Sequence, residues 1–220
     1  MAVKMAENKR FSLGVSTDFF QLLKARPQNR PVKFGGLNGK LQLCSIMPKE
    51  EIILRAPEPQ DVEFLYVLEN DRRLWSVSET RVPFSHFDLE QYILSASRQK
   101  PFAAGQVRLM IDHSKNGKKH PVGIIDLFDL NAIHRRGGIG IVIDEKYRNR
   151  SFAGEALDKL IDYAFNLLNL HQLYCSIGKE NEASLRLFQR RRFEITGERK
   201  SWNLINGKWQ DEYFLQRFNE

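Results

Sequence analysis

The sequence predicts a mixed α/β (α+β) domain with one central, mostly antiparallel sheet flanked by helices. Three observations carry this prediction. Short runs of alternating apolar residues recur along residues 51–220, as in half-buried strands. Asn-Gly at 116–117 and 206–207 separates such runs, and this dipeptide favours tight antiparallel hairpins. Between 152 and 168 the apolar spacing changes to three and four residues, which indicates an amphipathic helix.

Composition limits the class of protein. The chain has 220 residues, of which 42% are hydrophobic, enough for a full domain with a core. No apolar run reaches the roughly 18 residues that a membrane-spanning helix needs, so we expect no membrane. Cys44 and Cys175 are too few for a disulfide framework and lack metal-ligand spacing, so we expect no metal. A reducing, cytoplasmic setting is therefore the expected localisation.

The positive charge is concentrated at the N-terminus. The formal net charge is +7, and residues 1–50 hold nine Lys/Arg against three Asp/Glu, whereas residues 51–220 hold 25 against 24. We interpret 1–50 as a basic extension that is disordered or loosely packed, with Met47 as a conceivable natural start. A targeting sequence and unrelated upstream sequence are the alternatives. A nucleic-acid contact ranks last, because charged leaders are more often simply disordered.

The first half of the folded region alternates strand and helix. Glu51–Arg55 reads as a strand, and Pro57 and Pro59 end it. Pro59 suits the first turn of a helix, which we expect to continue to Asn70. We predict an irregular, aromatic-rich loop over 74–87 and a second helix over 88–98 with Asp88 near its N-cap.

The remaining elements complete the sheet. Strands at 106–112, 121–128 and 139–143 should form an antiparallel meander. After the central helix we predict, in order, a strand at 172–177, a helix at 181–191, and a hairpin of strands 193–204 and 209–218. The folded domain then covers residues 51–220.

One segment combines a strand, a polar loop and a helix start. Ile139, Ile141 and Ile143 form a buried strand, 144–151 is polar, and the apolar helix follows. The first N–H groups of a helix have no internal acceptor, and the helix dipole favours negative charge there. This segment therefore predicts an anion-binding site.

Three stretches carry a family resemblance: 131–136 (Asn-Ala-Ile-His-Arg-Arg), 147–157 around the loop, and 179–188, which is followed by Arg192 and Phe193. Together they resemble the GNAT superfamily of acetyl-CoA-dependent N-acetyltransferases. Within it, the sequence looks closest to the spermidine and the ribosomal-protein-alanine N-acetyltransferases. The resemblance implies a GNAT-like sheet with a splayed strand pair, 139–143 and 172–177, and acetyl-CoA as cofactor.

The resemblance also implies a cofactor site. In the family's loop pattern Arg148 and Ala153 match, but Ser151 stands where Gly is usual. A serine can occupy that position if its φ stays negative. Asn181 is both an implied cofactor contact and a candidate N-cap. The implied cofactor-binding residues are Ile141, Ile143, Arg148, Asn149, Arg150, Ser151, Phe152, Ala153, Asn181 and Phe188.

Two acid/base positions of the family are vacant. Phe188 occupies the position of the proton-donating Tyr, and Gly138 that of a Glu. We expect Phe188 to be a partly exposed apolar helix residue that packs near the cofactor. The general acid or base is unassigned; His134, Tyr147 and Tyr174 are weak candidates, and Cys175 is expected to be a buried, inert thiol.

The predicted function is acetyl transfer to a primary amine by direct attack in a ternary complex. The acceptor, a polyamine or diamine, another small amine, or a protein N-terminus, stays open. Glu79 is the candidate amine contact, but neighbouring arginines argue against an acidic funnel. The alternative is a catalytically silent acyl-CoA-binding domain of the same fold. A homodimer is an open expectation, since dimers are common among such proteins.

Overall fold

The structure, a computed structural model, describes residues 50–78 and 82–220. The predictions for 1–49 and for Glu79 lie outside the described residues. The described chain forms a seven-stranded sheet in the order β1-β2-β3-β4-β5-β7-β6. The strands are β1 (Glu51–Arg55), β2 (Val107–Lys115), β3 (Lys118–Asn131), β4 (Arg136–Ile143), β5 (Gln172–Gly178), β6 (Glu194–Ile205) and β7 (Lys208–Phe218).

The sheet confirms the predicted meander and the predicted hairpins. Strands β1 to β4 pair antiparallel in chain order, and β7 pairs antiparallel with both β5 and β6. Both Asn-Gly turns have positive φ at each residue: 54° and 77° at Asn116 and Gly117, and 50° and 76° at Asn206 and Gly207. This is the backbone that closes a two-residue hairpin with the twist of its strands.

Six α-helices connect the strands within the described residues. They are α1 (Val62–Glu69), α2 (Arg72–Ser78), α3 (His86–Ala96), α4 (Pro101–Ala104), α5 (Phe152–Asp162) and α6 (Glu182–Gln189). A 3-10 turn at Pro59–Asp61 precedes α1, and a π-helical turn at Tyr163–Leu167 continues α5.

Two predicted boundaries on this side of the molecule were wrong. The segment 74–87 is not one irregular loop, because α2 occupies its first residues. The second helix begins earlier than predicted, because Ser85 is its N-cap: the hydroxyl of Ser85 accepts from the N–H of Asp88 at 3.1 Å. Asp88 is thus the third helical residue, and its carboxylate accepts a hydrogen bond from the backbone N–H of Ser85, which completes a capping box.

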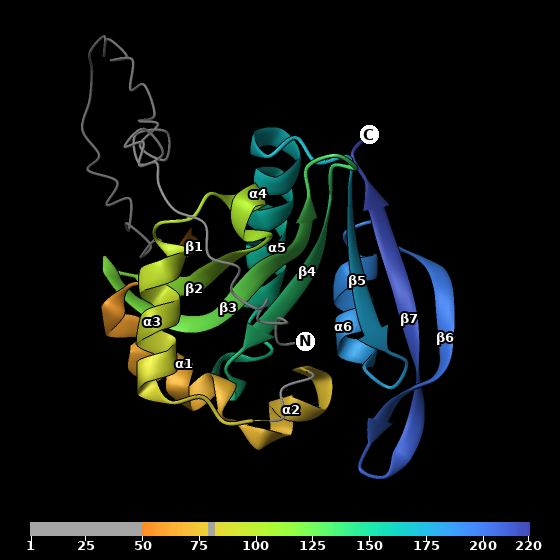
Figure 1. The fold of residues 1–220 in the computed structure, drawn as a ribbon, viewed down its shortest axis with the longest axis horizontal. Coiled ribbons are helices and arrows are strands. Elements are labelled where there is room, and N and C mark those ends of the chain that lie inside the picture. The colour runs from red at the N-terminus through yellow and green to blue at the C-terminus, as the bar shows by residue number, and fades with distance from the viewer. Residues whose placement is uncertain (1–49, 79–81) are drawn as a thin grey trace, which may run out of the picture. The chain divides into compact units, whose positions relative to one another are not determined.

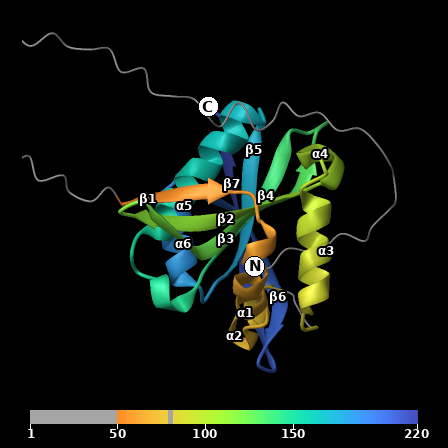
Figure 2. The same ribbon diagram turned by 90° about the vertical axis from the view of Figure 1, so that its left-hand side faces the viewer.

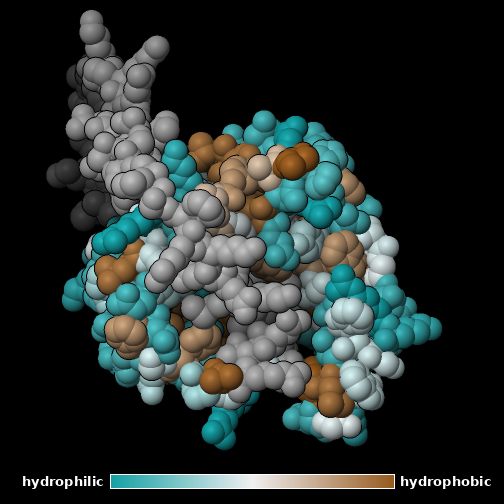
Figure 3. All heavy atoms as spheres, in the orientation of Figure 1, coloured by the Kyte–Doolittle hydropathy of each residue, from teal (hydrophilic) through white to brown (hydrophobic). Residues whose placement is uncertain are grey.

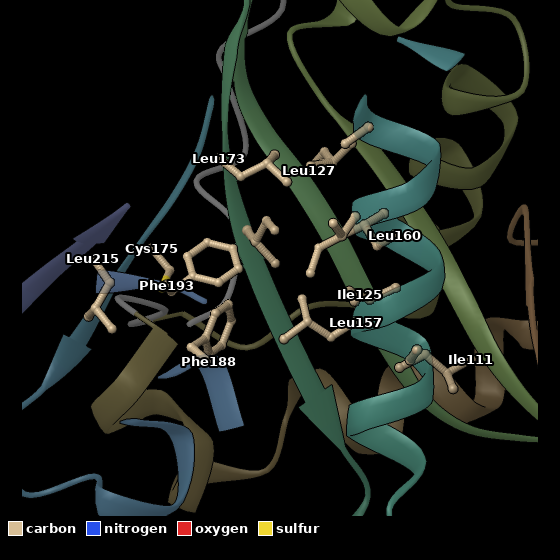
Figure 4. Packing of buried hydrophobic residues seen from close by; sticks show 14 of the residues in the cluster. Ile111, Ile125, Leu127, Leu157, Leu160, Leu173, Cys175, Phe188, Phe193 and Leu215 are labelled. Atoms are coloured by element: carbon tan, nitrogen blue, oxygen red, sulfur yellow. The ribbon is translucent and has the colours of Figure 1, made fainter. Parts of the chain in front are cut away.

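Helices cover both faces of the sheet. On one face, α1 and α3 pack on Met110 and Ile124. On the other, α5 buries its apolar stripe against β1, β3 and β4, and Figure 2 shows α5 and α3 on opposite sides of β2 and β3. Figure 4 shows Leu157 and Leu160 of α5 in this second core, with Phe188 and Phe193 beside Cys175 at its other end.

The parallel pair β4–β5 is short, as the predicted splay requires. Among the described residues, Arg136–Gly138 pair with Gln172–Tyr174, and the ladder stops there. From Ile139 onward β4 keeps its pairing with β3, and β5 keeps its pairing with β7. Figure 1 shows the two strands meeting at one end and diverging toward the other, which confirms the splayed pair.

The surface is mixed in character. Figure 3 shows scattered hydrophobic side chains among hydrophilic ones. The largest exposed ones on the β6–β7 hairpin are Trp202, Leu204 and Trp209. Within residues 50–78 and 82–220, no helix is both long and apolar enough to cross a membrane.

Candidate active site

The loop that follows β4 has two residues in the left-handed region. After a 3-10 turn at Glu145–Tyr147, Asn149 has a φ of 61° and Ser151 a φ of 64°. Ser151 therefore does not meet the condition of a negative φ under which a serine was considered acceptable at this position. Ser151 is the N-cap of α5, and its carbonyl accepts from the N–H groups of Gly154 and Glu155 at 2.9 and 3.2 Å. The chain reverses here so sharply that the conformation otherwise suited to Gly is imposed on Ser151.

The N-terminus of α5 meets the cationic part of the loop. The Ser151 side chain forms no capping hydrogen bond, and the first N–H groups of a helix lack internal acceptors. Arg148 and Arg150 are both exposed in this loop. The Nε of Arg148 donates to the carbonyl of Ile143 at 3.2 Å, which ties this side chain to the end of β4. Helix dipole and guanidinium groups together favour an anion at this end of the sheet.

Arg191, which sequence reasoning missed, joins the first turn of α5 to the C-terminal end of α6. Its guanidinium donates to the carbonyls of Gly154 and Leu187 at 3.1 and 3.2 Å and pairs with Asp158 at 2.8 Å. A Cβ at residue 154 would lie 2.3 Å from Nη2 of Arg191. A Gly in the first turn of an otherwise regular helix was the available sequence signal for such a close contact.

The predicted cofactor residues of the strands and of α6 lie around the splay. Ile141 and Ile143 point their side chains into the α5 core, so the backbone edge of β4 beyond Gly138 faces the gap to β5. Asn181 is the N-cap of α6, with its side-chain oxygen accepting from the N–H of Ser184 at 3.1 Å. Phe188 is not partly exposed as expected, because its side chain is only 3% exposed. Its ring meets that of Phe193 edge-on at 5.0 Å.

Aromatic side chains fill the closed end of the splay. A Cβ at Gly138 would lie 2.4 Å from the ring of Phe128, so that ring takes the space of the family's Glu. Tyr174, paired with Gly138, meets Phe128 edge-on at 6.0 Å and Phe214 at 5.4 Å. The Tyr174 hydroxyl donates to Oδ2 of Asp129 at 3.3 Å. Burial, reinforced by the nearby carboxylate, raises the pKa of Tyr174 to about 12.

The other candidates for acid/base chemistry lie elsewhere. His134 is exposed in the β3–β4 turn, where its backbone N–H donates to Asn131 at 2.8 Å. Tyr147 belongs to the loop at the open end, with Lys146 5.0 Å from its ring. Cys175 is 1% exposed, which confirms the predicted burial, and burial raises the pKa of its thiol well above the usual range.

Three carboxylates on the α1–α3 side, Glu69, Asp126 and Asp71, are paired with arginines, whereas Glu63 is exposed beside His86. Arg108 contacts Glu69 at 2.5 Å and Asp126 at 2.8 Å in a buried cluster. Burial raises the pKa of Asp126, against the lowering effect of Arg108. Asp71 pairs with Arg73 at 2.8 Å. Glu69 and Asp71, two of the carboxylates considered in the sequence, are therefore each neutralised by an arginine.

A splayed strand pair, with an arginine-containing loop and the start of a helix at its open end, is the arrangement expected of an acetyl-CoA-dependent N-acetyltransferase. The chain belongs to the acetyltransferase (GNAT) domain family, which it matches over residues 51–194. The fold, the family and the enzyme class predicted from the sequence are thereby confirmed.

Curated relatives agree with this assignment. The chain is 28% identical over 170 residues to the spermidine N(1)-acetyltransferase of Vibrio cholerae, covering 76% of this chain and 94% of that protein. It is 25% identical over 165 residues to a probable N-acetyltransferase, YjcK, of Bacillus subtilis, covering 70% and 91%. A crystal structure of the Vibrio cholerae enzyme with CoA and spermine superimposes with a TM-score of 0.67 at 26% identity, covering 76% of this chain and 95% of that one.

Proposed function

We propose that this chain transfers the acetyl group of acetyl-CoA directly to a primary amine in a ternary complex. The observation that carries the proposal is the splay, in which the β4 edge beyond Gly138 is left without a β5 partner. An extended pantetheine amide chain can pair with such an edge, as a strand would. Proximity and orientation then supply much of the rate enhancement.

The fit of the acetyl donor follows from the order of groups along β4. The phosphates would lie at the loop of Arg148 to Ala153, where helix N–H groups and two arginines converge. Ser151 would contribute its backbone rather than its hydroxyl. The pantetheine would run back along Ile143 and Ile141, and Asn181 and Phe188 would border it from α6. The thioester would then reach the closed end of the splay, near Gly138.

The acceptor would approach from the face of α1 and α3, opposite α5. Glu69 and Asp71 are each held by an arginine, so neither is free to compensate a polycation. Glu79, the predicted amine contact, lies outside the described residues. A spermidine acetyltransferase of Vibrio cholerae is a relative, but these pairings favour an acceptor recognised through one amino group.

The test is calorimetric binding of acetyl-CoA and CoA to the full chain, followed by thiol release with an amine panel. The panel contains spermidine, a diamine, a monoamine, an amino acid and a peptide with a free N-terminus. We expect binding of both nucleotides and CoA release with a panel member, and Arg148→Ala should weaken both. No binding would refute the proposal.

A second candidate function is a silent acyl-CoA-binding domain. The observation that favours it is the loss of both family acid/base groups, since Phe188 is buried and Phe128 fills the space at Gly138. Tight acetyl-CoA binding without thiol release from any amine would establish this function instead.

Among relatives, the Vibrio cholerae enzyme is known in a dodecameric form, superimposing with a TM-score of 0.63 at 26% identity and covering 76% and 93% of the two chains. We propose a homo-oligomer for this chain, which sedimentation of the full chain would test.

A further inference from the structure

We propose that Tyr174 donates the proton that the departing CoA sulfur takes up, and that Asp129 positions the Tyr174 hydroxyl and returns a proton to it. The inference rests on the proposed function, because it assumes that the thioester lies at the closed end of the splay. It assigns to β5 and β3 the role that Phe188 and Gly138 cannot perform.

The first step concerns position along the strand. Tyr174 is the last residue of β5 that pairs with β4, and its partner is Gly138. The loop of Arg148 to Ala153, where the phosphates would bind, lies at the opposite end of β4, beyond Ile143. An acetyl donor with its phosphates at that loop and its arm along β4 therefore brings its sulfur toward Tyr174.

The second step concerns the face of the sheet. Successive side chains of a strand point to opposite faces. Leu173 and Cys175 are buried in the α5 core, so Tyr174 points to the other face, from which the acceptor would approach. There it lies half-buried between the rings of Phe128 and Phe214, which restrict its orientation.

The third step concerns Asp129. Phe128 contacts Tyr174 on one face of the sheet, whereas Leu130 is buried in the α5 core on the other. Residues two apart in a regular strand share a face, so the alternation is broken at Asp129. The β3–β4 register shifts between Phe128 and Asn131, and Asp129 has a φ of 48°. This irregularity brings its carboxylate to the Tyr174 hydroxyl at 3.3 Å. Strained non-glycine conformations of this kind cluster at functional sites.

The proton transfers balance across the pair. The amine nitrogen attacks the thioester carbonyl and forms the C–N bond. As the C–S bond breaks, its electron pair goes to sulfur, and the Tyr174 hydroxyl gives its proton to form the CoA thiol. The nitrogen releases one proton to the Asp129 carboxylate, which passes it to the phenolate. The amide, the thiol and the original state of both side chains result.

The structure also separates Tyr174 from other tyrosines. Tyr147 lies at the phosphate end of the splay, and Tyr213 packs against the α5 core with Lys179 5.3 Å from its ring. Tyr163, in the π-helical turn after α5, is half-buried, and burial raises the pKa of its phenol as well. Tyr163→Phe is therefore a matched control for the loss of a partly buried phenolic hydroxyl on the α5 side of the sheet.

The experiment compares Tyr174→Phe, Asp129→Asn and Tyr163→Phe in the full chain, using CoA release with the best amine of the panel and calorimetric binding of acetyl-CoA. A general acid contributes about 10²–10⁴-fold to a rate. We expect Tyr174→Phe to lower kcat by about 10²-fold or more while the Kd for acetyl-CoA stays within twofold. Asp129→Asn, which leaves the phenol in place, should lower kcat about tenfold, and Tyr163→Phe should leave it unchanged.

The outcomes separate the two proposals. A wild-type chain that binds acetyl-CoA but releases no CoA overturns the proposed function and this inference with it. An active wild type, with kcat of Tyr174→Phe within threefold of it, overturns this inference alone. So does a loss of rate that follows weakened acetyl-CoA binding. If Tyr174→Phe fails to fold, Asp129→Asn decides, since Asp129 is exposed and its substitution leaves the Tyr174 ring packing intact.

Discussion

Replacing Ser151 by Gly should stabilise the loop between β4 and α5 without weakening acetyl-CoA binding. Ser151 holds a φ of 64° as the N-cap of α5, and its side chain makes no capping bond there. A non-glycine residue in this region costs about 1–2 kcal/mol. Glycine also frees the unfolded chain, which takes back about 0.4–1 kcal/mol. The expected net gain is about 0.5–1 kcal/mol, or a Tm rise of about 1–4 °C for a chain of this size.

The same substitution measures what the hydroxyl does for the cofactor. If the Ser151 hydroxyl donated to a phosphate, its loss would cost about 1.5–3 kcal/mol, which is about 10- to 150-fold in Kd. We expect instead a Kd for acetyl-CoA within threefold of wild type, since the backbone N–H groups remain. Calorimetric titration and a thermal melt of the same preparation give both quantities.

Ser151→Ala separates strain from hydrogen bonding. Alanine removes the hydroxyl but keeps the Cβ, so it retains the cost of the left-handed backbone at residue 151. It should match wild type in Kd and show no rise in Tm. A more than tenfold loss of affinity in both Ser151→Gly and Ser151→Ala would refute the reasoning and make the hydroxyl a phosphate ligand.

Three further substitutions test the packing around the splay. Gly138→Glu, which restores the family's carboxylate, should lower the free energy of unfolding by about 1–3 kcal/mol because the new side chain meets the Phe128 ring; a chemical denaturation curve that matches wild type would contradict this. Phe188→Tyr should cost about 1–3 kcal/mol, since its hydroxyl enters a buried site, and should raise kcat by less than twofold. A larger rate gain would show that a missing proton donor limits turnover. Arg191→Gln should lower stability by about 2 kcal/mol and loosen the first turn of α5, seen as faster amide exchange there; unchanged exchange would refute this.

Local sequence signals accounted for much of the fold. The strand Glu51–Arg55 has the predicted bounds, both Asn-Gly turns close hairpins, and the helix after the loop buries the predicted apolar stripe. Each depends on near neighbours in sequence, through alternation, turn chemistry or helical spacing. These signals were strong enough to place the polar loop 144–151 between a buried strand and a helix start.

The errors and omissions share a different cause. The positive φ of Ser151 is set by how the β4 end and the α5 start are joined, and the sequence at that residue permits either sign of φ. The burial of Phe188 depends on Phe193, which the chain brings back after α6. The carboxylate of Asp129 meets Tyr174 because the β3–β4 register shifts between strands, and no residue-by-residue pattern announces such a shift. In all three cases packing and chain connection, rather than the preference of a single residue, determined the outcome.

The short β4–β5 ladder has a consequence for the stability of the sheet. Among the described residues, three β4–β5 residue pairs join the first four strands to the last three, and past Gly138 the two strands no longer pair with each other. Exposed strand edges are normally a hazard on the outside of a protein, because strands of other molecules can pair with them. Here the edges of β4 and β5 face each other across the gap between them, so each half of the sheet shields the edge of the other. Acetyl-CoA bound in this gap would join the two halves of the sheet. Resistance to heat and to proteases should therefore rise as the gap becomes occupied.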